Sequence, residues 1–339
     1  MRQLVVLDKA TDAAGVARVE GLKEEWARRR MDTVRRIATA ASVGMDAVLG
    51  DDDKAADSRL QSFGQMRVLA TRNATRIIRD KVMLTIVTVL SVIISLIVGL
   101  IFVQLDLSQT GIQNIAGALF YVVVNQTFST ADPTFIAVPM ELPMIIREYQ
   151  AGLYHLLSWY ISKNISELPM QILTPILFFT PVYFLVGIGH GFTTYLYMQL
   201  IMILVSSCAI GLGYMISCLA RRVELAPLIG VVAIMTLTIF GGLLINSDDC
   251  PVYFVWIQYI SPIKYGFEAL MKIYWSQVAS IPCNELVENC VALTGDQVLA
   301  NYSMTSRTAV SDALILIAIN FGYRVVGFLG LWLSVRRTD

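Results

Sequence analysis

Long apolar runs separated by short polar connections make up most of the chain after residue 81. Six of them, at about 82–103, 112–138, 159–187, 192–219, 225–245 and 309–333, each have the ~20 residues that a helix needs to cross a bilayer core. The pattern predicts an all-α membrane protein with six transmembrane helices. The longest connection, residues 246–308, lies between the fifth and sixth spans.

Two polar regions precede the first span. Residues 1–62 are interpreted as a cytoplasmic N-terminal segment or a linker remnant, with a polar helix near 21–41 and an acidic run from Asp51 to Asp53. Residues 62–81 predict an amphipathic approach helix, because Arg72, Arg76 and Arg79 recur at helical spacing and share one face. We expect this face to contact anionic lipid head groups or an adjacent cytoplasmic domain.

A third polar region, residues 141–169, follows the second span and overlaps the start of the third. It mixes Arg147, Glu148, Lys163 and Glu167 with aromatic residues, a composition typical of a helix at a membrane surface. Two interpretations fit this composition. The region is either a loop that only tethers the two spans, or a cytoplasmic coupling helix that receives force from a partner domain.

The connection 246–308 begins with aromatic and apolar residues that do not amount to a seventh span. It contains Pro262 and the charged residues Lys264, Glu268 and Lys272. A charge at the centre of a span costs roughly 2.5–3.5 kcal/mol on insertion. We therefore expect re-entrant or interfacial helices before the last span.

The distribution of basic residues predicts the orientation. Sixteen of the 26 Lys and Arg residues lie in residues 1–81, which indicates a solvated segment and no nucleic-acid partner. The connections after spans one and three contain no Lys or Arg, whereas those after spans two and four do. Because cytoplasmic loops are rich in Lys and Arg, both termini are predicted to be cytoplasmic. The pattern does not distinguish the plasma membrane from an organelle membrane.

Composition and motifs exclude several classes of protein. Only 15% of the residues are charged, against about 25% in soluble domains. The sequence contains no G-x-x-x-x-G-K-[ST] phosphate loop, so it is not expected to hydrolyse ATP by that route. His155 and His190 are the two histidines and fall on opposite sides of the predicted membrane, so no metal site is expected. We predict no enzyme activity for these residues.

The outer connection carries candidate modifications. Cys250, Cys283 and Cys290 lie there, on the side where disulfides form. Cys283 and Cys290 are close enough in sequence to pair, although spacing alone does not establish the bond. The sequon at Asn301 is exposed to a glycosylating compartment in this topology, and an unmodified loop asparagine is the alternative.

Polar residues inside the spans suggest sites. Asn125 and Gln126 in span two either line a cavity or bridge to a neighbouring helix. Arg324 in span six is expected to extend its guanidinium to the inner head groups.

Several strings, in one order along the chain, carry a resemblance to a known family. They are Arg147-Glu148-Tyr149, Gly117 to Phe120, Asn125 to Phe128, Ile239 to Asn246, and Tyr259 to Leu270. Together they resemble the membrane domain of G-subfamily ABC transporters, the group of insect eye-pigment, sterol and multidrug half-transporters. The resemblance implies a six-helix ABC-2 type transmembrane domain over residues 63–339. The ATP-binding domain that precedes this region in the family is missing from the sequence.

The resemblance also implies roles for individual residues. Arg147, Glu148 and Tyr149 would contact the ATPase, with an ion pair holding the coupling helix in register. Leu243 and Leu244 match an apolar plug above the substrate cavity, and Cys283 and Cys290 match an outer-loop cysteine pair. The residues implied to line the substrate cavity are Phe120, Asn125, Phe128, Val231, Met235 and Thr238.

The implied function is outward transport of hydrophobic or amphipathic compounds, such as a lipid, sterol, pigment precursor or xenobiotic. The transporter would be a homo- or heterodimer of G-type half-transporters among membrane lipids. ATP and Mg²⁺ would bind to an ATP-binding domain, and the chain itself would need no cofactor. The alternative is a non-transporting, truncated subunit that dimerises with full-length half-transporters and regulates them.

Overall fold

The computed structural model describes residues 62–188, 191–220, 222–245, 250–283 and 290–336, with Gly21, Glu25, Trp26, Arg28 and Met31. These residues are mostly helical, and none of them forms a strand. The chain divides into two units, Met1–Gln61 and Ser62–Asp339, and helices α3 to α13 belong to the second. Most of the N-terminal segment, including the acidic run Asp51 to Asp53 and most of the helix expected near 21–41, lies outside the described residues.

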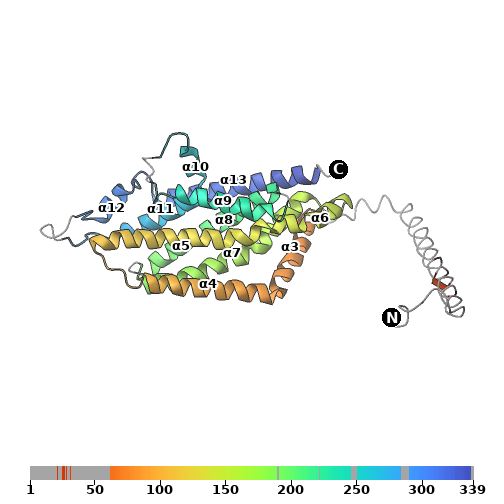
Figure 1. Cartoon of the computed structure of the whole chain (residues 1–339), viewed down its shortest axis with the longest axis horizontal. Coiled ribbons are helices and arrows are strands. Elements are labelled where there is room, and N and C mark those ends of the chain that lie inside the picture. The colour runs from red at the N-terminus through yellow and green to blue at the C-terminus, as the bar shows by residue number, and fades with distance from the viewer. Residues whose placement is uncertain are drawn as a thin grey trace, which may run out of the picture. The chain divides into compact units, whose positions relative to one another are not determined.

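A helix occurs at each of the six predicted spans, and these helices run alongside one another (Figure 1). Four are long and apolar enough to cross a membrane: α4 (Lys81–Ile101), α7 (Leu156–Val186), α8 (Phe192–Ala220) and α13 (Ala309–Arg336). The other two are α5 (Gln109–Phe135), which is long but more polar, and α9 (Leu225–Ile239), which is apolar but shorter. The all-helical membrane fold is confirmed, and six complete spans remain a prediction.

The fifth apolar helix is shorter than its hydropathy suggested. α9 ends at Ile239, well before residue 245, and residues 241–245 are not helical. Gly242 has a φ of +95°, a conformation that glycine adopts far more readily than other residues. The predicted boundary is therefore wrong, because the glycine pair ends the helix inside an apolar run.

The approach helix is present as α3 (Ser62–Arg79). It packs against α7, where the Ser166 hydroxyl donates to the Ala70 carbonyl at 3.2 Å. Asp80 separates α3 from α4, and its carboxylate caps α4 by accepting from the Met83 amide at 3.1 Å. Residues 62–101 thus form two helices joined at one capping residue (Figure 1).

Residues 141–169 divide between two helices. α6 (Ala137–Gln150) follows α5 after a joint at Ile136, and a short turn leads into α7 at Leu156. Residues 159–169 are therefore the first turns of a span candidate, and only α6 corresponds to the predicted coupling helix. The expectation of one surface segment is corrected.

Three short helices precede α13: α10 (Val255–Ile260), α11 (Pro262–Trp275) and α12 (Gly295–Asn301). Ser261 caps α11 by accepting from the Lys264 amide at 3.3 Å, and Pro262 occupies the first helical position. α11 packs against α5, α8 and α13, and nearly all of its side chains are buried. Whether α11 is re-entrant or interfacial stays a prediction.

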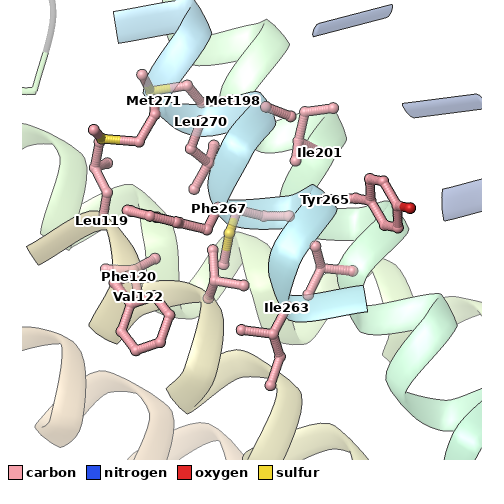
Figure 2. Close-up of a cluster of buried hydrophobic side chains, with 14 of the residues drawn as sticks. Leu119, Phe120, Val122, Met198, Ile201, Ile263, Tyr265, Phe267, Leu270 and Met271 are labelled. Carbon is pink, nitrogen blue, oxygen red and sulfur yellow. The ribbon is translucent and has the colours of Figure 1, made fainter. Parts of the chain in front are cut away.

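The core is centred on α11 (Figure 2). Phe267 of α11 meets Phe120 of α5 edge to face, with ring centroids 5.2 Å apart. Gly266, next to it, lets α11 approach both α5 and α8, because a β-carbon there would lie 2.5 Å from Val205 and 3.1 Å from Val123. The absence of a side chain at this position therefore permits the close packing.

We expect Gly266→Ala to destabilise the protein by about 1–3 kcal/mol, because the added methyl group overpacks a filled core. The measurement is the thermal unfolding midpoint of the purified chain in detergent. Gly117→Ala in α5 is the control: its β-carbon would meet open space, so the midpoint should stay unchanged or rise slightly. Equal shifts in both variants would contradict the close approach of α11.

Candidate functional site

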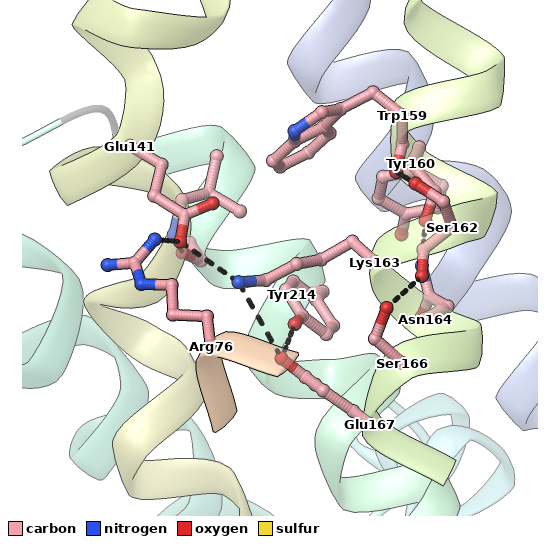
Figure 3. A network of polar contacts seen from close by, with 12 residues as sticks. Arg76, Glu141, Trp159, Tyr160, Ser162, Lys163, Asn164, Ser166, Glu167 and Tyr214 are labelled. Atoms are coloured by element: carbon pink, nitrogen blue, oxygen red, sulfur yellow. Dashed lines mark hydrogen bonds and ion pairs between the residues drawn. The ribbon is translucent and has the colours of Figure 1, made fainter. Parts of the chain in front are cut away.

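A chain of charged and polar side chains joins four helices at the α6 end of the bundle (Figure 3). The Glu141 carboxylate of α6 accepts from Arg76 of α3 and from Lys163 of α7, both at 3.0 Å. The Lys163 ammonium also lies 3.9 Å from the Glu167 carboxylate, one helical turn further along α7. Glu167 accepts a hydrogen bond from the Tyr214 hydroxyl of α8. α6 is thereby linked to α3, α7 and α8 through one set of contacts.

Burial makes the inner part of this network important for stability. The side chains of Glu141 and Lys163 are 11% and 12% exposed, whereas that of Arg76 is 69% exposed. Removing one partner from a buried pair leaves the other charge without compensation, which is far more costly than losing an exposed pair. The buried contact of Glu141 with Lys163, which links α6 to α7, is therefore expected to contribute more to stability than its contact with Arg76, which links α6 to α3.

Glu148 of α6 forms a second link to α3. Its carboxylate lies 3.3 Å from the Arg72 guanidinium and accepts from the Tyr154 hydroxyl at 2.8 Å. Burial, followed by the hydrogen bond to Glu148, raises the pKa of Tyr154, so the hydroxyl stays protonated and can donate. The ion pair of the coupling helix is thus made with Arg72, while Arg147 is exposed.

Two arginines of α3 therefore bind carboxylates of the same chain. Arg72 pairs with Glu148 and Arg76 with Glu141. Both arginine side chains remain exposed, and their contact with lipid head groups or another domain stays a prediction. Arg79 is exposed at the end of the helix.

Arg324 of α13 is partly buried, and its side chain lies against α7 and α8. Its guanidinium contacts Asn164 of α7 and donates to Asn320 at 2.9 Å and to the Ser207 hydroxyl of α8 at 3.1 Å. The Tyr160 hydroxyl donates to the Arg324 carbonyl at 3.0 Å. The prediction that this side chain extends to the head groups is wrong, because α13 turns it towards polar groups of α7 and α8.

The two neighbouring amides of α5 differ in their surroundings. Gln126 is buried, and its amide lies 3.4 Å from the Ser206 hydroxyl of α8, so it bridges two helices. Asn125 is only partly buried. Of the two roles considered for these amides, helix bridging applies to Gln126.

The residues predicted to line a substrate cavity do not share one environment. Phe120 is buried against Phe267 in the core (Figure 2), whereas Val231 and Met235 lie on an uncovered face of α9. The rest are partly buried: Asn125, Phe128 and Thr238. α5 packs against α9, so these residues lie on adjoining helices. Their role in substrate binding stays a prediction.

The predicted plug residues follow the end of α9. Leu243 packs against the core, while Leu244 is 62% exposed. Both line a hollow of about 720 Å³ at the α12 end of the bundle. Gln109 closes one side of this hollow: its side-chain oxygen accepts from the Val291 amide at 2.8 Å, and its side-chain amide donates to the Ala292 carbonyl at 2.9 Å.

The disulfide between Cys283 and Cys290 is present, with α-carbons 6.0 Å apart, which confirms this pairing. Cys250 is a buried free thiol. Asn301 is exposed at the end of α12, and its amide donates to the Val291 carbonyl at 3.1 Å. Its glycosylation stays a prediction.

Several structurally important groups had no assigned role in the sequence. Lys272 of α11 binds Glu268 at 2.6 Å and Asp312 of α13 at 2.8 Å, and all three are buried. The spacing of Glu268 and Lys272, four residues apart, could have indicated that pair. No local signal identifies Asp312 or Tyr214 as partners, because their contacts join helices distant in sequence.

Within the described ranges, no three His, Cys, Asp or Glu side chains are grouped so as to hold a metal ion. His155 is exposed at the start of α7, and His190 lies outside the described residues. The chemistry of the site is therefore that of ion pairs and hydrogen bonds between helices.

Apolar helices joined by buried ion pairs define an integral membrane domain. The chain belongs to the ABC-2 type transporter family, whose model matches residues 64–275. Protein white of Ceratitis capitata is 28% identical over 279 residues, which cover 82% of this chain and 41% of that protein. The ATP-binding protein/permease wht-1 of Caenorhabditis elegans is 30% identical over 281 residues, covering 81% and 42%.

A third relative is the broad substrate specificity transporter ABCG2 of Sus scrofa, which is 30% identical over 207 residues covering 61% of this chain and 31% of that protein. These relatives are of the white and ABCG types, and they match the transmembrane region of the chain. The chain spans less than half the length of each.

We expect Lys163→Met to lower the free energy of unfolding by about 3–5 kcal/mol, because it leaves Glu141 and Glu167 without their buried partner. Thermal or denaturant unfolding in detergent measures the loss. Arg72→Met serves as the control, since its pair with Glu148 is more exposed and should contribute at most about 1 kcal/mol.

The double variant Lys163→Met/Glu141→Gln should recover part of the loss, because the unpaired carboxylate is neutralised. If the stability lost by the double variant equals the sum of the losses of Lys163→Met and Glu141→Gln alone, the two side chains do not interact.

Proposed function

We propose that this chain is the membrane part of an ATP-driven exporter of hydrophobic or amphipathic compounds. Energy would come from ATP and Mg²⁺ bound to an ATP-binding domain. Family membership supports the proposal, as do two relatives, one named as an ATP-binding protein and permease and the other as a transporter of broad substrate specificity.

The linkage of α6 to the bundle is the observation that carries this proposal. Glu141 and Glu148 tie α6 to α3 and α7, and Glu167 with Tyr214 extends the contacts to α8. A displacement of α6 would therefore be passed to several helices at once. We infer that the α6 end faces the cytoplasm and that exposed Arg147, with partly buried Tyr149, meets the ATP-binding domain.

The transport path would form between two copies of such a domain, identical or different. The uncovered face of α9, with Val231 and Met235, would meet the partner and form the cavity with Asn125, Phe128 and Thr238. Apolar surface with a few amides suits a mostly apolar ligand. Phe120 would support this surface from behind, and Leu243 and Leu244 would close the path at the α12 end.

The experiment measures ATP hydrolysis stimulated by a candidate substrate. The chain is co-expressed with a G-type partner that carries an ATP-binding domain, and the purified complex is placed in lipid nanodiscs. Arg147→Ala should lower the stimulated rate several-fold without changing the melting temperature, because an exposed contact with the ATPase is lost. Arg79→Ala, also exposed and basic but on α3, is the matched control and should retain the rate.

Absence of stimulated hydrolysis and of transport in a folded complex would contradict the export proposal. If the chain then also lowered the activity of its partner in proportion to its amount, the regulatory alternative would replace it. Equal losses in both arginine variants would remove the specific role of α6.

A further inference from the structure

A cavity of about 360 Å³ lies where α3 joins α4, beside the charge network of the α6 end. Its volume falls within the range of small-molecule sites. Charged and amide side chains form part of the lining, α4 contributes the apolar Met83, Leu84 and Val87, and α5 contributes mainly the hydroxyl side chains Ser129, Thr130 and Thr134. The polar end is formed by Asn73, Arg76, Glu141, Lys163 and Glu167.

The apolar walls adjoin the surface that would face lipid. Met83 and Leu84 of α4 and Met170 of α7 line the cavity, and Met83 is 46% exposed. α4 is the least buried of the four span candidates and packs mainly along α7. The partly exposed Met83 thus connects the cavity wall to the outer surface of α4.

Asn73 supplies an unused hydrogen-bond donor at the polar end. Its side chain is 93% buried, since only 7% is exposed, and its amide nitrogen has no hydrogen-bond partner among the residues that the structure describes. Such groups are rare in folded proteins, because a buried donor without an acceptor is unfavourable. The position of Asn73 in the cavity wall indicates that a bound molecule provides the acceptor.

The charges around the cavity argue against an anionic ligand. Arg76 and Lys163 are already paired with Glu141, and Lys163 also lies near Glu167. Asp80 adds a further carboxylate to the lining. The two basic groups thus face three acidic ones, and no positive charge remains to bind a phosphate or carboxylate.

We propose that this cavity binds one uncharged lipid whose hydroxyl or carbonyl head group accepts a hydrogen bond from Asn73. Its hydrocarbon part lies along Met83 and Met170. The site is built within a single chain, so it depends neither on a second copy nor on the proposed transport activity.

The test uses the full chain in nanodiscs and a monoacylglycerol with a photoreactive diazirine in its acyl chain. After irradiation, mass spectrometry should find the label on peptides containing Met83 and Met170, and unlabelled monoacylglycerol should compete with it. Asn73→Leu should reduce this labelling about tenfold, the ratio that corresponds to about 1.4 kcal/mol. Asn114→Leu, the same change at an exposed position of α5, should leave it unchanged.

A second variant tests the site without changing Asn73, in case Asn73→Leu misfolds. Thr174→Phe fills the cavity while Asn73 stays intact, and it should also abolish the labelling. Unchanged labelling in a folded Asn73→Leu chain, or in the filled variant, would overturn the proposal. Equal labelling by a lysophosphatidic acid that carries the same photoreactive chain would also overturn the proposal. Labels spread evenly along α4 would overturn it as well.

Discussion

Lys163 is almost removed from solvent and lies between two carboxylates, Glu141 of α6 and Glu167 of its own helix. A charge in such surroundings is tolerated only when the chain itself supplies the partners, because hydrocarbon cannot solvate it. The partners come from different elements, so satisfying one lysine also fixes the position of α6 against α7. The placement of α3 then follows, since Arg76 shares the same carboxylate.

Other charged side chains in the bundle are likewise paired with polar groups on neighbouring helices. Arg324 binds polar groups of α7 and α8, and Lys272 of α11 binds Glu268 and, on α13, Asp312. These contacts connect α7, α8, α11 and α13 into one body. α4 and α9 take no part in them among the described residues, and both leave much apolar surface uncovered. Apolar side chains are also exposed on α7, α8 and α13, for example Phe184, Tyr197 and Phe321, so the ionic framework alone does not decide which surfaces face lipid or a partner.

The sequence predicted well the features that depend on local hydropathy, such as the four span candidates and the approach helix. It did not predict the contacts between helices that are distant in the sequence. Arg72 and Glu148 are 76 positions apart, and nothing local pairs them. For Arg324, hydropathy placed the residue in the span but could not show that its face of α13 meets Asn164 and Ser207. The end of α9 was missed because Gly242 acts through its backbone conformation.

Phe120 shows why a residue matched by family pattern can act indirectly. Its ring packs against Phe267 of α11, so it contributes to the core that holds α11 between α5 and α8. α11 also carries Lys272, which binds Asp312 at the start of α13. A change at the α5 and α9 surface that moves Phe120 would therefore also displace α11, against which its ring packs. The contact between Phe120 and Phe267 therefore links the packing of α5 to that of α11.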